Sequence, residues 1–222
     1  MLCENRWTMR RVASLREFPL AGGDAAAKEP RRTALGIWHE LREERDCGFA
    51  PEEAALLRSQ LRAGVNVWRC SSAGRLFDAF AALLGVCDVN RHEGEAPMQV
   101  AAEAGKAMRE GASAAAYPFG LEGDVMDWET MWRAVADSGE PVLRIALRIH
   151  ATFAAMMRAV ARRAGVADVC LTGGCFQNRL LLKLAMEGLA GDGFRVHVHR
   201  EVPCNDAGIA YGQLAAMRPD GV

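Results

Sequence analysis

The end of the chain holds two strand–turn–helix patterns in succession, and this order constrains the fold more than any other feature. Val166–Leu171 is a short apolar run, Thr172-Gly173-Gly174 predicts a tight turn, and Phe176–Leu189 has helical spacing. Gly193–Arg200 then alternates as a strand does, and Asp206–Met217 returns to helical spacing. Successive β-α-β-α units form parallel sheets whose strands end at the same edge. We therefore expect an α/β fold in which both turns face one crevice.

The residues before this end favour helices. Ser71-Ser72 is typical of a helix N-terminus and Gly64 of a helix C-terminus. The expected helices are Asp24–Leu41, which Pro30 could instead begin, Pro51–Gly64, Ser72–Leu84, Pro97–Gly111, Asp127–Asp137 and Pro141–Gly165, with Tyr117–Phe119 a short strand or a loop. Trp7–Phe18 alternates like one or two strands. We divide the chain into residues 1–22, strands that come from an incomplete upstream lobe, and residues 23–222, one helix-rich lobe with the β-α-β-α end.

Composition argues against several classes of protein. The 222 residues are 50% hydrophobic and 25% charged, as in an ordinary globular protein, and 27 Lys and Arg stand against 28 Asp and Glu. Because this balance creates no positive field, stand-alone binding of nucleic acid is not expected. The sequence has no apolar run of about 18 residues that would cross a membrane. The seven Cys are scattered without a C-x-x-C pair, so a reducing cytoplasm fits better than a disulfide framework or a zinc knuckle.

The first candidate binding feature is the turn at Gly173-Gly174. A glycine pair between a buried strand and a helix start lets backbone N–H groups approach a phosphate at the positive end of the helix. Asn178 would lie in the first turn of that helix, where its amide could reach a ligand group. The alternative is that the glycines only permit a tight strand-to-helix turn.

Asp206 is the second candidate, because it stands at the start of the last helix with small residues behind it. It could be the helix N-cap. It could also be a metal ligand, since a carboxylate beside a phosphate turn can hold the divalent cation that phosphates require. The expected proximity of the two turns favours the metal-binding role.

Asp78 and Glu95 form the third candidate. Both carboxylates could accept hydrogen bonds from ribose hydroxyls, while Gly74 and Gly94 would let a ring or sugar approach the backbone. The alternative for Asp78 is a solvated position on an amphipathic helix.

Several short sequence segments, taken in order along the chain, resemble one family. The matching segments are Phe18-Pro19-Leu20, Gly22-Gly23-Asp24-Ala25, Glu29-Pro30, Ser71-Ser72-Ala73-Gly74-Arg75-Leu76-Phe77-Asp78-Ala79, Glu93-Gly94, Tyr117-Pro118-Phe119, His150, Gly173-Gly174, Phe176-Gln177-Asn178-Arg179, His199-Arg200, Val202-Pro203, Asn205-Asp206, Gly208-Ile209-Ala210 and Gly212-Gln213. Together they resemble the C-terminal domain of the hydrogenase maturation carbamoyltransferase family HypF.

The resemblance implies an actin-like, sugar-kinase-like ATPase fold, which is shared with the tRNA threonylcarbamoyl-transferases. It implies that carbamoyl-adenylate is made from carbamoyl phosphate and ATP, and that the carbamoyl group passes to the terminal Cys of a partner, HypE. Asp206 then corresponds to a metal-binding aspartate and Asn178 to a nucleotide contact beside Gly173 and Gly174. Asp78, with Glu95 or Gln99, corresponds to the ribose side.

The chain departs from this family in its histidines. The family's upstream lobe carries a His-x-x-x-His pair that completes the metal site, and none of the five His here forms such a pair. His197 and His199 lie two residues apart and could share a strand face as ligands, but an ordinary polar strand face is the favoured explanation. We expect a divalent cation, magnesium or iron, completed by ligands outside this chain, and upstream HypF modules in cis or in trans. The chain alone is expected to be inactive.

Two other functions stay open at this point. One is a tRNA threonylcarbamoyl-type transferase on the same fold, which activity on a HypE peptide versus tRNA would distinguish. The other is a non-catalytic remnant, or one subunit of a split enzyme.

Overall fold

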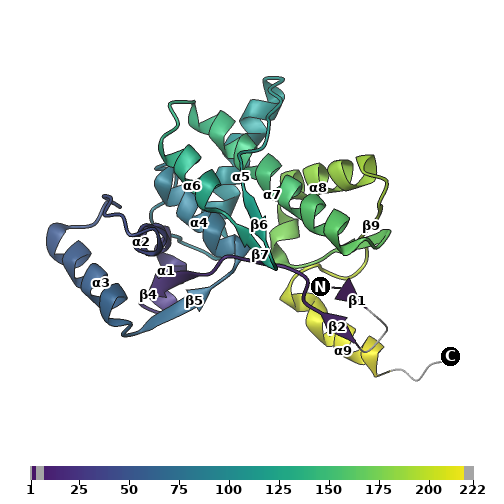
Figure 1. Cartoon of the computed structure of the whole chain (residues 1–222), viewed down its shortest axis with the longest axis horizontal. Helices are drawn as coiled ribbons and strands as arrows, with labels where there is room; N and C mark the ends of the chain where they lie inside the picture. The colour runs from purple at the N-terminus through teal and green to yellow at the C-terminus, as the bar shows by residue number, and fades with distance from the viewer. Residues whose placement is uncertain (1, 4–7, 218–222) are drawn as a thin grey trace. The chain divides into compact units, whose positions relative to one another are not determined.

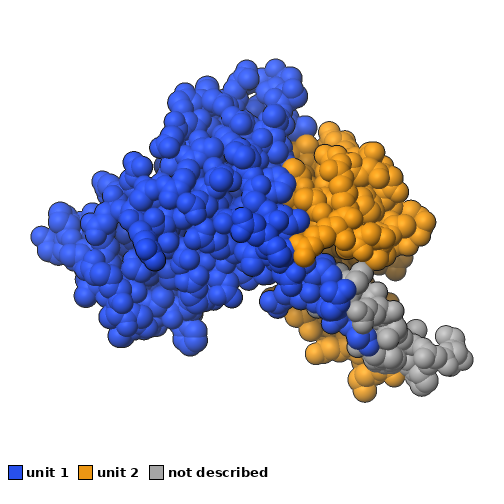
Figure 2. All heavy atoms as spheres, in the orientation of Figure 1, with its two compact units in different colours: residues 1–152 blue, residues 153–222 orange. Residues whose placement is uncertain are grey.

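The computed structural model describes residues 2–3 and 8–217, with side chains from residue 8 onward. It confirms the predicted α/β class, with mostly helices first and a β-α-β-α end (Figure 1). The chain divides into two compact units, Met1–Thr152 and Phe153–Val222, which Figure 2 colours separately. The proposed division at residue 22 stays a prediction.

Unit 1 combines short strands with six helices and the start of a seventh among its described residues. Its elements are β1 (Leu2–Cys3), β2 (Met9–Arg10), β3 (Ser14–Leu15), β4 (Phe18–Ala21), α1 (Asp24–Lys28), α2 (Pro30–Glu40), α3 (Pro51–Ala63), β5 (Val67–Cys70), α4 (Ala73–Leu83), α5 (Glu95–Arg109), β6 (Gly120–Glu122), β7 (Val125–Asp127), α6 (Glu129–Ala136) and the first part of α7 (Val142–Ala164). No helix in the described ranges has both the length and the apolar character needed to cross a bilayer.

Several helix boundaries follow the capping signals of the sequence. Pro51 begins α3, and Gly64 ends it in the left-handed conformation with φ of 67°. Ser72 caps α4, because its Oγ accepts a hydrogen bond from the Arg75 N–H at 3.4 Å. The ambiguity near Pro30 is resolved by two helices: Asp24 begins α1, and Pro30 begins α2 after a break at Glu29.

The strands that pair over long distances were not predicted from the sequence. β5 pairs antiparallel with β4, so that Phe18 lies opposite Cys70. β6 and β7 form a hairpin, and β3 runs parallel to β7. Tyr117–Phe119 is a loop that precedes β6. These strands are only two to four residues long, so their own sequences carry little periodicity.

The core of unit 1 is aromatic and depends on close packing of α2 against β4. Trp132 is fully buried and lies 5.3 Å from Trp38 and 5.2 Å from Phe80, measured between ring centroids. Gly36 of α2 approaches β4 so closely that an added Cβ would stand 1.9 Å from the carbonyl oxygen of Pro19. A glycine is therefore required at position 36 by packing, although it is unfavourable inside a helix.

Unit 2 continues from the end of α7 with β8 (Asp168–Leu171), the 3-10 turn η1 (Gly174–Gln177), α8 (Arg179–Gly191), β9 (Arg195–Val198), the 3-10 turn η2 (Asp206–Gly208) and α9 (Ile209–Ala216). β8 and β9 are parallel, and their register pairs Leu171 with Val198. Apolar side chains on one face of this sheet pack with Ala185 and Leu189 of α8. The C-terminus of α8 is held by Asp192, whose carboxylate accepts hydrogen bonds from Arg158 and Arg162 of α7.

The close approach at Gly36 predicts a large effect of one methyl group. Gly36→Ala should lower the free energy of unfolding by about 1–3 kcal/mol, because the backbone of β4 must shift to admit the Cβ. Gly105→Ala is the matched control in α5, where the nearest atom is the flexible end of Arg109 at 3.4 Å. That change should be neutral or stabilise by up to about 1 kcal/mol through helix propensity. Urea denaturation would contradict the packing interpretation if both variants behaved alike.

Candidate functional site

The turns that follow β8 and β9 lie side by side in unit 2. The backbone N–H of Gly173 donates a hydrogen bond to the carbonyl oxygen of Cys204 at 2.8 Å. The side chains meet as well, since Nε2 of His199 lies 2.9 Å from Oγ1 of Thr172. The parallel register explains this arrangement, because both strands end at the same edge. The expected proximity of the two turns is confirmed.

Gly173 and Gly174 of the first turn differ in the physical reason for a glycine at each position. Gly173 has φ of 108°, which an L side chain rarely adopts, so local backbone geometry explains this glycine. Gly174 has no such φ, and an added Cβ would meet nothing within 4 Å. The turn alone therefore accounts for Gly173 but not for Gly174. A bare backbone beside open space at Gly174 suits the close approach of a ligand.

Asn178 is the N-cap of α8. The predicted helix start at Phe176 was wrong: residues 174–177 form η1, and α8 begins at Arg179. Oδ1 of Asn178 accepts hydrogen bonds from the N–H groups of Leu180 and Leu181, both at 3.1 Å. These donors at the positive end of α8 are therefore already used by the protein.

Asp206 does not cap the last helix. Asn205 is the cap residue of η2, and its Oδ1 accepts a hydrogen bond from the Ala207 N–H at 3.2 Å. Asp206 is exposed at the start of η2. The capping alternative for Asp206 is thereby excluded. The cap hydrogen bond is made by Asn205 and does not use the carboxylate of Asp206. Among the residues that the structure describes, no three His, Cys, Asp or Glu gather as metal ligands.

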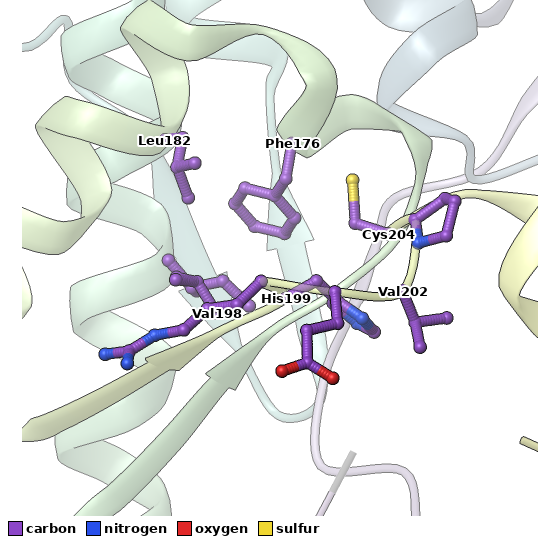
Figure 3. A pocket seen from close by; sticks show the side chains of 10 residues that line it. Phe176, Leu182, Val198, His199, Val202 and Cys204 are labelled. Atoms are coloured by element: carbon purple, nitrogen blue, oxygen red, sulfur yellow. The ribbon is translucent and has the colours of Figure 1, made fainter.

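A hollow of about 370 Å³ opens beside these turns and was not expected from the sequence. Figure 3 shows Phe176 and Leu182 pointing from η1 and α8 toward Val198 and His199 at the end of β9. The complete lining is Leu171, Phe176, Leu182, Val198, His199, Arg200, Glu201, Val202, Pro203 and Cys204. Apolar walls with charged groups among them are common in small-molecule sites. The alternating apolar residues of β9 predict a strand face, and that pattern alone does not indicate a hollow.

His197 belongs to the exposed face of the β8–β9 sheet. Its Nε2 lies 2.8 Å from Oδ1 of Asp168, and Nε of Arg195 donates to the same oxygen at 2.9 Å. These hydrogen bonds hold the pKa of Asp168 well below its usual range, with Arg195 the larger cause. His197 is therefore part of a polar strand face, whereas His199 contacts the glycine turn.

In unit 1, Asp78 is completely buried, which excludes the alternative of a solvated helix position. Its Oδ2 lies 2.7 Å from Nη1 of Arg75 in an ion pair. Burial raises the pKa of Asp78 to about 6, against the opposing effects of Arg75 and Asn90. Arg75 and Asn90 both donate to the carbonyl oxygen of Ala27, at 3.2 and 2.9 Å. Arg75, the ion-pair partner of Asp78, thus connects α4 to α1 through the carbonyl oxygen of Ala27, which Asn90 in the loop after α4 also contacts.

Glu95 and Gln99 lie together at the start of α5. Oε1 of Glu95 accepts hydrogen bonds from Nε of Arg91 at 2.9 Å and from Nε2 of Gln99 at 3.2 Å. The side chain and the backbone N–H of Arg91 lower the pKa of Glu95 to about 2. The neighbouring Ala96 N–H donates to Oδ1 of Asn90 at 2.8 Å. The predicted ribose residues therefore share one region of unit 1, while Gly173, Gly174, Asn178 and Asp206 belong to unit 2.

Residues 1–213 match the family described as “Carbamoyltransferase, Kae1-like Domain, second subdomain”. The chain belongs to the HypF carbamoyltransferase family. Carbamoyltransferase HypF of Rhodobacter capsulatus is 38% identical over 211 residues, which cover 91% of this chain and 27% of that protein. A carbamoyltransferase HypF homolog of Cupriavidus necator is 33% identical and is covered over 58% of its length.

Solved structures give the same assignment. Full-length HypF in a phosphate- and nucleotide-bound form superimposes with a TM-score of 0.84 at 30% identity, over 98% of this chain and 36% of that one. HypF of T. kodakarensis gives a TM-score of 0.79 at 29% identity, over 91% and 29% of the two chains. The Kae1-like domain of HypF has the actin-like ATPase fold, as predicted. The chain spans about a quarter to three fifths of the curated relatives named here.

Burial of Asp78 makes a pH-dependent contribution to stability. Its folded pKa of about 6 exceeds the unfolded value of about 3.9, so folding favours the protonated carboxyl. The resulting stabilisation is fully present below pH 4 and is lost as the pH rises through 6. Between pH 4 and 7 the unfolding free energy of the wild type should fall by up to about 3 kcal/mol relative to Asp78→Asn.

Urea denaturation at several pH values measures this difference. Asp137→Asn, at an exposed aspartate just after α6, is the matched control and should keep the wild-type profile. Parallel pH profiles of Asp78→Asn and the wild type would rule out the contribution of Asp78.

Proposed function

We propose that this chain is the nucleotide-binding part of a HypF-type carbamoyltransferase. In this proposal it binds ATP and carbamoyl-adenylate made from carbamoyl phosphate, and the carbamoyl group passes to the terminal Cys of a HypE-like acceptor. The observation that carries the proposal is the hydrogen bond from Gly173 N–H to Cys204 O, since it joins the glycine turn to the segment that bears Asp206. Family membership supplies the reaction class.

The phosphate groups would bind at the Gly174 side of the turn. An approaching phosphate needs backbone without a side chain in front of it, and an added Cβ at Gly174 would point into open space. The N–H groups of Leu180 and Leu181 cannot serve, because they donate to Asn178. The contacts would therefore come from the turn and from the side-chain amide nitrogen of Asn178.

Asp206 would supply one carboxylate ligand to a divalent cation, magnesium or iron. Asn205 performs the capping, so the Asp206 carboxylate is suited to this task. One carboxylate is a poor site by itself, because such cations need several ligands held together. The remaining ligands would come from upstream HypF modules in cis or in trans. A cation bound there would neutralise phosphate charge.

The ribose hydroxyls would contact Glu95 and Gln99, which form a hydrogen-bonded pair at the start of α5. Asp78 has no exposed surface, so it would act as a positioning residue. It contacts Arg75, which shares the carbonyl oxygen of Ala27 with Asn90, and Asn90 holds the backbone of Ala96 next to Glu95. Through these contacts Asp78 would keep the first turn of α5 in place.

A hybrid enzyme tests the proposal most directly. In it, this chain replaces the region of the Rhodobacter capsulatus relative that it matches. Given carbamoyl phosphate, ATP, a divalent cation and a HypE acceptor, the hybrid enzyme should produce a carbamoylated terminal Cys that mass spectrometry detects. The 222-residue chain alone should produce none. A folded hybrid enzyme that binds ATP but never modifies the acceptor would contradict the assigned reaction.

The double role of Asn178 can be separated by the choice of replacement. Asn178→Ser keeps an N-cap oxygen but loses the amide, so ATP binding to the hybrid enzyme should weaken about tenfold or more while the melting temperature is nearly unchanged. Asn178→Ala removes both functions and should also cost about 1 kcal/mol of stability. Calorimetric titration with ATP gives the affinities. Equal affinity of Asn178→Ser and the wild type would remove Asn178 from the site.

Asp206→Asn tests the cation ligand. The amide lacks the negative charge that the cation prefers, and Asp206 neither caps a helix nor is buried. Bound metal and carbamoyl transfer by the hybrid enzyme should fall at least tenfold, with little change in melting temperature. Glu187→Gln is the matched control, an exposed carboxylate on α8 of the same unit. Full metal content in Asp206→Asn would exclude Asp206 as a ligand.

A further inference from the structure

The last described helix of unit 2, α9, contributes no buried residue to the core of that unit. Every residue from Ile209 through Met217 is exposed, and α9 has no buried residue. The large apolar side chains of α9 are Ile209, Tyr211 and Leu214, which are 55, 63 and 67% exposed, and Met217 directly after the helix is 79% exposed. α9 is the yellow helix in Figure 1. It therefore presents an apolar surface to solvent on more than one side.

Such a helix is unstable by itself. Eight residues are fewer than the roughly 12–15 that an isolated helix needs in water. A helix that is apolar on all sides is normally buried in the core of a protein. α9 lacks a charged residue over its whole length, so ion pairs do not stabilise it either. The composition of α9 thus requires contacts that the described residues do not provide.

The start of α9 is nevertheless fixed by its own unit. Asn205 caps η2, from which α9 continues directly. Gly208 approaches the preceding segment so closely that an added Cβ would stand 2.5 Å from the carbonyl oxygen of Pro203. The close contact and the cap together set the direction in which the chain enters α9.

We propose that α9 is the docking surface for the first subdomain of the Kae1-like domain, whether that subdomain lies on the same chain or on another. The family that the chain matches is a second subdomain, which implies a first one, and full-length HypF extends well beyond the matched part. This inference rests on the proposed function, because it assigns the upstream partner to one surface.

The position of Asp206 favours this partner over a second copy of the chain. Asp206 lies three residues before Ile209, so a subdomain seated on α9 would bring its own groups next to that carboxylate. The cation proposed at Asp206 needs ligands from outside this chain, and an upstream subdomain could supply them. A second copy would bring the same residues again, and these lack the His-x-x-x-His pair that the upstream lobe of the family carries.

Two leucines form a matched pair for the test. Leu214 of α9 and Leu56 of α3 are 67 and 69% exposed, and only the first lies on the proposed docking surface. In the isolated chain, Leu214→Glu and Leu56→Glu should both leave the melting temperature within about 2 °C of the wild type. A large loss for Leu214→Glu alone would mean that α9 packs within this chain, and would overturn the proposal.

Hydrogen exchange in the hybrid enzyme tests docking itself. The amides of α9 should exchange at least tenfold more slowly in the hybrid enzyme than in the isolated chain. Leu214→Glu should abolish this protection, and Leu56→Glu should retain it, with α4 and α7 as internal measures of folding. Equal exchange of α9 in both proteins would overturn the proposal, as would a discrete dimer of the isolated chain that Leu214→Glu dissociates. Protection of α9 without carbamoyl transfer would refute the proposed reaction while docking stands.

Discussion

The parallel register of β8 and β9 is the constraint on which the candidate site depends. Because Leu171 lies opposite Val198, the two strands end level, and the chain must leave both of them at the same edge. Gly173 can then donate to Cys204, and α8 covers the apolar face of the sheet. A slip of one residue would move the apolar side chains of β9 to the exposed face and separate the turns.

The role of each polar side chain in this protein depends more on its surroundings than on its residue type. Asp78 and Asp206 are both aspartates, yet one is completely buried against Arg75 and the other is exposed. Asn90, Asn178 and Asn205 each accept a hydrogen bond from the backbone with Oδ1. A ligand contact proposed for such a residue must therefore be consistent with the structural bond that it already makes.

The sequence predicts features that depend on neighbouring residues, such as helix ends. It does not predict features that depend on residues far apart in the chain, such as strand pairing. The limits of α3 could be read from Pro51 and Gly64, since a cap acts within a few residues. β5 could not be read in this way, because it exists through pairing with β4 some 50 residues earlier. For the site, the neighbouring turns followed from the β-α-β-α order. The burial of Asp78 and the capping by Asn178 did not, because each depends on the position of a partner in space.

The exposed helix α9 also has a consequence for the behaviour of the chain in solution. The formal net charge is only −1 at pH 7, so two molecules repel each other weakly. Attraction between apolar surfaces then meets little electrostatic opposition, and it does not decline when salt is added. Without its partner, the chain should therefore associate with itself and become less soluble as its concentration rises. A change of pH that increases the net charge should reduce this association more than a lower salt concentration does.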